Sequence, residues 1–223
     1  MPTSVASTNP QLSAPSGRTW FGHPIGLFVL FFTEMWERFS YYGMRGLLKL
    51  YMVNYLFVTT RTVLQGGSET VNGDPYTVFG WRWFESLLPV DVQGQSSVIY
   101  GWYTGLVYLT PLFGGWLADR YWGQRKTVVV GGILMAMGHF VLAFENWFFL
   151  GLLLLILGNG AFKPNVSTQV GNLYAADDPR RDGAFTIFYM GINLGAFICN
   201  FVCGTLAAVY GWHYGFGAAG VGM

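Results

Sequence analysis

The sequence is poor in charge. Asp, Glu, Lys and Arg together make up 10% of the 223 residues, whereas a soluble domain carries about 25%. Hydrophobic residues account for 52% and aromatic residues for 18%, so there are too few charged side chains to cover the surface of a soluble globule of this size. This shortage excludes an ordinary soluble domain and predicts an integral protein of the lipid bilayer.

Other features are missing too. The net charge of +1 indicates no nucleic-acid partner. The sequence shows no set of metal ligands, no nucleophile with its base and no phosphate-binding loop, so we expect no enzyme, no metal and no cofactor. The two cysteines, Cys199 and Cys203, stand four residues apart in an apolar run, and we expect them to pack on one helix face without forming a disulfide.

The first residues lack an apolar run of signal-peptide length. Residues 1–19 are rich in Ser, Thr, Pro and Asn and carry one charge, Arg18, so residues 1–21 are predicted to be a disordered cytoplasmic tail. Residues 22–223 are predicted to form a transmembrane bundle. Apolar runs long enough for the bilayer predict helices at about 25–57, 98–118, 127–144, 147–174 and 184–210, with the start of a sixth from 212.

The connections between these runs indicate the orientation. If the N-terminus is cytoplasmic, six basic residues lie inside, namely Arg18, Arg120, Arg125, Lys126, Arg180 and Arg181. Arg61 and Arg82 lie outside, in the long connection 58–97, where we expect a loop with room for a short surface helix. This distribution obeys the positive-inside rule and predicts a multi-pass protein of the inner (plasma) membrane with a cytoplasmic N-terminus.

The first predicted helix carries charges that lipid excludes. At 100° per residue, six polar side chains fall within an arc of about 140°, namely Glu34, Glu37, Arg38, Tyr41, Tyr42 and Arg45. An ionisable group costs about 2.5–3.5 kcal/mol at the middle of a membrane. This face is therefore expected to look into the protein or into a water-filled cavity.

Two interpretations of this polar face are open. Glu34 and Arg38 stand four residues apart and can pair, whereas the side chains of the neighbours Glu37 and Arg38 are expected to diverge by about 100°. Such charges can simply lock helices together. Two carboxylates in a low-dielectric site also offer a proton carrier. We favour the functional interpretation, because two acids, two arginines and two tyrosines exceed what locking needs.

A lysine lies deep in the fourth predicted span, directly before a proline. Pro164 allows the helix to kink, and eleven residues separate Lys163 from Tyr174 and the cytoplasmic loop. Lys163 is therefore expected to face inward and to need an anionic partner. The acids available within the membrane are Glu34 and Glu37.

The remaining polar positions are weaker signals. Asn193 in the fifth span serves equally well as glue between helices or as an amide that faces a ligand. A single buried tyrosine such as Tyr103 is usually a packing residue. Gly191 and Gly195 form a GxxxG spacing, which permits close helix contact.

Several of these segments together resemble a known family. The stretch 115–126 (G-W-L-A-D-R-Y-W-G-Q-R-K) resembles the signature loop of the major facilitator superfamily, which takes part in the cytoplasmic gate. Three further stretches resemble motifs of the proton-coupled oligopeptide transporters, namely 34–43 (E-x-x-E-R-F-x-Y-Y-G), 162–167 (F-K-P-N-V-S) and 188–195 (F-Y-x-x-I-N-x-G). The likeness covers nearly all of residues 22–223.

The resemblance implies an all-α membrane protein with two six-helix bundles, of which this chain is expected to supply the N-terminal one with its sixth helix truncated. It implies a proton-coupling cluster with Lys163 as salt-bridge partner of the acids: Glu34, Glu37, Arg38 and Lys163. It implies a peptide site in which the first two members hold the carboxylate: Arg45, Lys163, Tyr41, Tyr42, Tyr103 and Asn193. The cytoplasmic gate loop would contain Asp119, Arg120 and Arg125.

The implied function is proton-coupled symport of di- and tripeptides by alternating access. The expected partners are small peptides, protons as the coupling ion, the lipid bilayer and the missing C-terminal bundle, which holds the family's clamp for the peptide amino group. A proton from outside would neutralise one acid and free a basic group for the substrate carboxylate. Two alternatives stay open: a transporter of the same fold for another small anion such as nitrate, and a membrane sensor that binds without transport.

Overall fold

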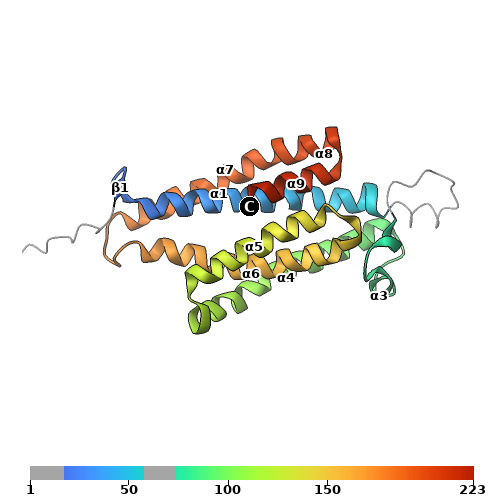
Figure 1. Cartoon of the computed structure of the whole chain (residues 1–223), viewed down its shortest axis with the longest axis horizontal. Coiled ribbons are helices and arrows are strands. Elements are labelled where there is room, and N and C mark those ends of the chain that lie inside the picture. The colour runs from blue at the N-terminus through green and yellow to red at the C-terminus, as the bar shows by residue number, and fades with distance from the viewer. Residues whose placement is uncertain (1–17, 58–73) are drawn as a thin grey trace, which may run out of the picture.

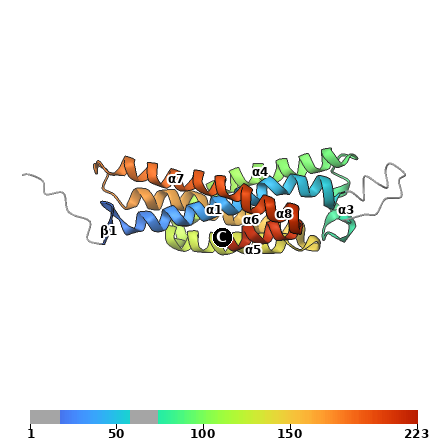
Figure 2. The ribbon, with the colours of Figure 1, turned by 90° about the horizontal axis from the view of Figure 1, so that it is seen from above.

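The chain folds into a bundle of long helices whose axes run in similar directions (Figures 1 and 2). A computed structural model describes residues 18–57 and 74–223. The long helices are α1 (Ile25–Tyr51), α4 (Val92–Leu117), α5 (Gln124–Leu142), α6 (Phe148–Asn172) and α7 (Arg181–Cys199). The π-helical segments Met52–Leu56, Ala118–Trp122 and Asn200–Gly204 prolong α1, α4 and α7, and the chain continues into α8 (Thr205–Tyr210) and α9 (Trp212–Gly222).

These helices confirm the all-α class, and they correspond to the predicted spans with shifted bounds. Helix α4 begins at Val92 and not near residue 98, because Asp91 caps its N-terminus: the Asp91 carboxylate accepts from the backbone N–H of Gly94 at 2.6 Å. The expected loop after this helix is almost absent. The π-helical segment reaches Trp122, and Gly123, whose φ of +76° suits glycine, makes the turn into α5.

The segments before and after α1 contain short elements of secondary structure that the sequence predicted only in part. Strand β1 (Thr19–Trp20) pairs antiparallel with β2 (His23–Pro24), so the last residues of the predicted tail 1–21 are ordered, while residues 1–17 lie outside the described residues. In the connection 58–97, residues 58–73 also lie outside the described residues. The rest of that connection contains the 3-10 turn Pro75–Thr77 and helix α3 (Trp81–Glu85), which confirms the short surface helix.

Three stretches of the described chain are long and apolar enough to cross a bilayer: Gln124–Leu142, Glu145–Asn172 and Arg181–Tyr210. Helix α1 does not reach the same hydropathy, because its charges lie in the middle of the helix. Its 27 residues nevertheless span about 40 Å at 1.5 Å per residue, which exceeds a hydrocarbon core of about 30 Å. Helix α1 is therefore long enough to cross a bilayer, and its charged residues Glu34, Glu37 and Arg38 are buried within the protein.

Small residues let the helices approach closely. Helix α1 packs against α7 and α9, and α6 packs against α5 and α4. A Cβ atom at Gly195 would collide with the carbonyl oxygen of Met35, and one at Gly191 would lie 3.0 Å from Phe31. The predicted close contact at the GxxxG spacing is thus confirmed. Both cysteines of the chain are free and buried, as predicted.

Candidate functional site

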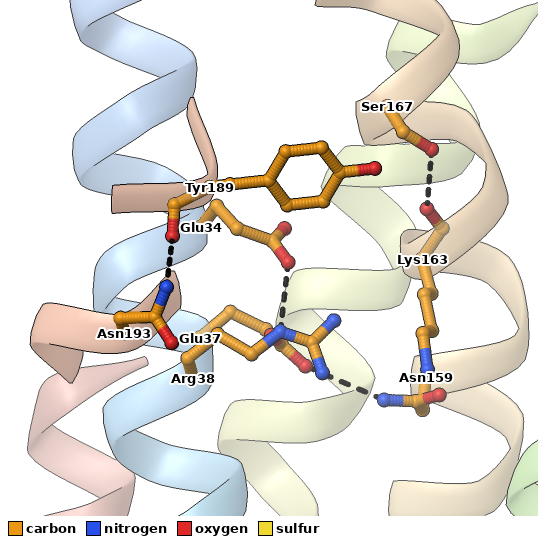
Figure 3. Close-up of polar contacts among 8 residues, drawn as sticks. All are labelled: Glu34, Glu37, Arg38, Asn159, Lys163, Ser167, Tyr189 and Asn193. Atoms are coloured by element: carbon orange, nitrogen blue, oxygen red, sulfur yellow. Dashed lines mark hydrogen bonds and ion pairs between the residues drawn. The ribbon is translucent and has the colours of Figure 1, made fainter. Parts of the chain in front are cut away.

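Helix α1 buries two carboxylates against one guanidinium. The exposed fractions of Glu34, Glu37 and Arg38 are 3%, 0% and 5%. The Arg38 Nε donates to Glu34 Oε1 at 2.7 Å, across one helical turn. Figure 3 shows this group on the side of α1 that faces α6. The predicted i, i+4 pair is confirmed, and the polar face of α1 does look into the protein.

The prediction that Glu37 and Arg38 diverge is wrong. The Arg38 Nε also lies 2.7 Å from Glu37 Oε2, because the long arginine side chain can fold back over its own helix. The single Nε–H points at Glu34, so the contact with Glu37 Oε2 is electrostatic and lacks hydrogen-bond geometry. The other oxygen, Glu37 Oε1, accepts from Asn159 Nδ2 of α6 at 3.3 Å.

This cluster has more negative than positive groups. With both acids ionised, two carboxylates share one guanidinium, which leaves an excess of one negative charge in a site closed to solvent. Burying an unpaired charge costs several kcal/mol unless a partner or a proton compensates it. The arrangement can therefore take up one proton and become electrically balanced. Asn159, which sequence reasoning missed, supplies the amide contact from α6.

Lys163 does not form the expected salt bridge. Within the described chain its ammonium pairs with neither acid, and its Nζ lies 5.1 Å from the ring centroid of Tyr108 in α4. A cation over an aromatic face is stabilised without neutralisation of its charge. Lys163 is half-buried, and Figure 3 shows its side chain running beside the buried Asn159.

Arg45 also has a neutral partner. Its Nε donates to the hydroxyl of Tyr100 at 2.6 Å, and its guanidinium lies 5.9 Å from the ring centroid of Tyr41 and 5.7 Å from that of Tyr100. The side chain is half-buried. Tyr100 was missed by the sequence reading, although it stands one turn before Tyr103 on the same helix.

The other predicted peptide-site residues divide into two groups. Tyr41 and Tyr103 are buried in the core of the bundle, and Tyr42 is half-buried with its ring centroid 5.3 Å from that of Tyr41. Asn193 is exposed, and its amide donates to the backbone oxygen of Tyr189 in its own helix at 3.0 Å. The Arg38 guanidinium lies 5.7 Å from the ring centroid of Tyr41. Among the described residues Asn193 makes no hydrogen bond to the charged cluster, and Figure 3 shows its bond to Tyr189.

The predicted gate residues lie at the turn between α4 and α5. Asp119, Arg120 and Arg125 are all exposed. The Arg120 guanidinium lies 5.8 Å from the ring centroid of Tyr121, and no ion pair joins the three charges within the part of the chain that the structure describes. Among the same described residues, no group of three His, Cys, Asp or Glu could hold a metal ion.

Comparisons with known proteins agree on one family. Residues 125–223 match the model of the POT family. The chain is 44% identical over 216 residues to the peptide transporter YePEPT of Yersinia enterocolitica subsp. palearctica, covering 95% of this chain and 37% of that protein. It is 42% identical to a di-/tripeptide transporter of Lactococcus lactis subsp. lactis, covering 92% and 37%.

Solved structures give the same answer for the fold. A crystal structure of the peptide transporter POT in complex with sulfate matches with a TM-score of 0.72 at 43% identity, covering 94% of this chain and 37% of that one. The chain thus spans just over a third of the length of these relatives and matches the N-terminal part of the transporter fold. Together with the motifs at 34–43, 162–167 and 188–195, these matches show that the chain belongs to the POT family.

Proposed function

We propose that this chain is the N-terminal bundle of a proton-coupled symporter of di- and tripeptides that works by alternating access. The observation that carries the proposal is the pair of buried carboxylates, Glu34 and Glu37, each 2.7 Å from the Nε of Arg38. Two further cations, Arg45 and Lys163, are half-buried and contact neutral tyrosines. Relatives named as peptide transporters support the cargo.

The proton site is the carboxylate pair. One guanidinium cannot neutralise two carboxylates, so a proton that reaches the cluster from outside removes the excess negative charge. We assign the proton to Glu37, which is fully buried and which, unlike Glu34, accepts no hydrogen bond from the Arg38 Nε–H. Lys163 stands close to the same site and is the group that the acids would hold when both are ionised.

The substrate carboxylate is received by Arg45 and Lys163. Their present partners, the hydroxyl of Tyr100 and the ring of Tyr108, are neutral, so an incoming carboxylate does not have to displace another anion. Tyr41, Tyr42, Tyr103 and Asn193 would complete the peptide site. The amino group of the peptide would be bound by a second, C-terminal bundle.

Proton and substrate would favour the same conformational change. Each ligand shifts the equilibrium toward the state that binds it better, and rocking of two bundles around a central site then gives access from alternate sides. The proposed orientation in the inner (plasma) membrane places the N-terminus and the turn with Asp119, Arg120 and Arg125 on the cytoplasmic side. That turn would belong to the cytoplasmic gate.

The test is transport by the complete protein in liposomes. Glu37→Gln is expected to lose uptake driven by an imposed proton gradient but to keep exchange of labelled for unlabelled dipeptide, because the substitution removes the proton site and spares the peptide site. Asp177→Asn, which changes an exposed loop carboxylate, is the matched control and should keep both activities. Full proton-driven accumulation by Glu37→Gln would refute the scheme.

A second candidate function is favoured by the same two cations. Arg45 and Lys163, paired with neutral groups, would also suit a small inorganic anion such as nitrate. Competition separates the two cargoes: di- and tripeptides at saturating concentration should abolish uptake of a labelled dipeptide, and nitrate should not. The reverse result would favour the anion.

A further inference from the structure

A buried amide from α6 contacts the proposed proton site. Asn159 has an exposed fraction of 1%, and its Nδ2 donates to Glu37 Oε1 at 3.3 Å. Its other polar atom, Oδ1, is buried without a hydrogen-bond partner among the described residues, and so is Glu37 Oε2. Both atoms belong to the two residues that this hydrogen bond joins, and Glu37 Oε2 has only its electrostatic contact with Arg38 Nε at 2.7 Å. Buried polar atoms are normally hydrogen-bonded.

One added proton would satisfy both of these atoms. An ionised carboxylate only accepts hydrogen bonds, whereas a protonated carboxyl also donates one, and an asparagine amide offers both a donor and an acceptor. A proton on Glu37 Oε2 can therefore be donated to Asn159 Oδ1 once rotation of the two side chains brings these oxygens within hydrogen-bond distance. The amide contact to Glu37 would then persist in both protonation states.

We propose that Asn159 is the positioning residue for the proton on Glu37. Its N–H holds the ionised carboxylate, and its carbonyl oxygen accepts from the protonated one. The inference rests on the proposed function, since it requires that Glu37 takes up the transported proton. Asn159 touches neither substrate nor the gate and acts through Glu37 alone.

The hydrogen bond from Asn159 to Glu37 links the proposed proton site to the helix that carries Lys163. Lys163 stands four residues later on the same helix and so lies on the same face one turn away, and Figure 3 shows its side chain alongside the amide. Asn159 therefore connects the acid on α1 to the helix that carries a cation for the substrate carboxylate. A plain packing role for the amide would predict no such dependence on protons.

The test measures how proton-driven dipeptide uptake by the complete transporter depends on external pH. Asn159→Leu has nearly the same size but can neither donate nor accept. A hydrogen bond to a charged group is stronger than one between neutral groups, so the substitution destabilises the ionised form more than the protonated form. We expect the midpoint of the pH profile to move about one to two units to higher pH, which corresponds to a 10- to 100-fold change in proton affinity.

Two controls keep the test specific. Asn165→Leu removes another buried amide of α6, whose Nδ2 donates to the Ala161 oxygen of its own helix at 2.7 Å and to the Gly114 oxygen of α4 at 3.4 Å. It contacts neither acid through these bonds and should leave the midpoint unchanged. If Asn159→Leu does not reach the membrane, Asn159→Asp replaces it: its carboxylate has the same shape, cannot donate when ionised, and repels an ionised Glu37. We expect it to shift the midpoint in the same direction.

A double variant tests whether the amide acts through the acid. If it does, Glu37→Gln combined with Asn159→Leu should show the same exchange rate as Glu37→Gln alone, since contacts that share one partner are not additive. An unchanged midpoint in Asn159→Leu, or additive losses in the double variant, would overturn this inference and leave the proposed function standing. If the unsubstituted transporter shows no proton-driven uptake, the proposed function fails and this inference fails with it.

Discussion

Replacement of Arg38 by Met should destabilise the protein in a way that depends on pH. The guanidinium lies 2.7 Å from two carboxylates that are at most 3% exposed. The cluster already has one carboxylate in excess, so the substitution leaves a second one without a cation. Loss of one partner from a buried ion pair costs about 3–5 kcal/mol, and we expect the free energy of unfolding to fall by this amount at pH 7.5.

The pH dependence arises because protonation can neutralise the carboxylate that has lost its cation. A glutamate of ordinary pKa, about 4.3, costs about 4 kcal/mol to neutralise at pH 7.5 but about 1 kcal/mol at pH 5, at 1.36 kcal/mol per pH unit. A stranded carboxylate can take up a proton for about that cost. The destabilisation by Arg38→Met should therefore shrink to about 1–2 kcal/mol at pH 5.

The measurement is equilibrium unfolding of the complete protein in mixed micelles at both pH values, followed by tryptophan fluorescence. Arg45→Met is the matched control. Arg45 is half-buried and bonds the neutral hydroxyl of Tyr100, so its loss strands no charge and should cost about 1 kcal/mol at either pH. Equal losses in the two variants at pH 7.5, or a loss in Arg38→Met that does not change with pH, would refute the reasoning.

Two further predictions concern packing and the turn of residues 173–180 between α6 and α7. Gly195→Ala should lower the free energy of unfolding by about 1–3 kcal/mol, since its Cβ would collide with a carbonyl oxygen of α1; Gly204→Ala, whose Cβ would meet open space, should not. At the turn, the Arg180 guanidinium donates to Asp178 at 2.7 and 3.0 Å and lowers the pKa of that carboxyl to about 2. The ionised Asp178 stabilises the turn at any pH above its unfolded pKa near 4, and this stabilisation is lost only as the pH falls through about 2. Trypsin cleavage after Arg180 should therefore stay slow over the whole pH range in which trypsin is active. Asp178→Asn should speed that cleavage several-fold, and Asp177→Asn, which changes an exposed neighbour, should leave it unchanged.

The helices and the charged face of α1 could be predicted because each depends on residues close in sequence. The period of 3.6 residues places Glu34 and Arg38 on one face, and the cost of a charge in lipid determines that this face points inward. The close contact at Gly195 was predictable for a similar reason, since glycines four residues apart leave one side of a helix bare. Local rules sufficed for these features.

The contacts of the cluster could not be predicted in the same way. Angles around the helix axis describe where a side chain starts, but the Arg38 side chain is long enough to return to Glu37. Asn159 reaches Glu37 from α6, and Tyr100 reaches Arg45 from α4. The height of both residues relative to α1 depends on how the helices slide along one another. A single sequence carries no direct signal for that register. The polar residues Asn159 and Tyr100 within apolar helices were the available indication that these positions face charged groups.

The contact of Lys163 with a tyrosine bears on the proposed mechanism. If Lys163 were paired with Glu37 in every state, a substrate carboxylate would have to break a buried ion pair, and loss of one partner costs about 3–5 kcal/mol. Over the ring of Tyr108 the ammonium is held by a contact of about 0.5–2 kcal/mol, so a carboxylate can take it at a much smaller cost. The ring of Tyr108 on α4 thus gives the half-buried ammonium a partner when it is not paired with an acid, and the same reasoning applies to the half-buried Arg45 with Tyr100. The tyrosines of α4 would then keep both cations available to the substrate while the carboxylate pair on α1 handles the proton.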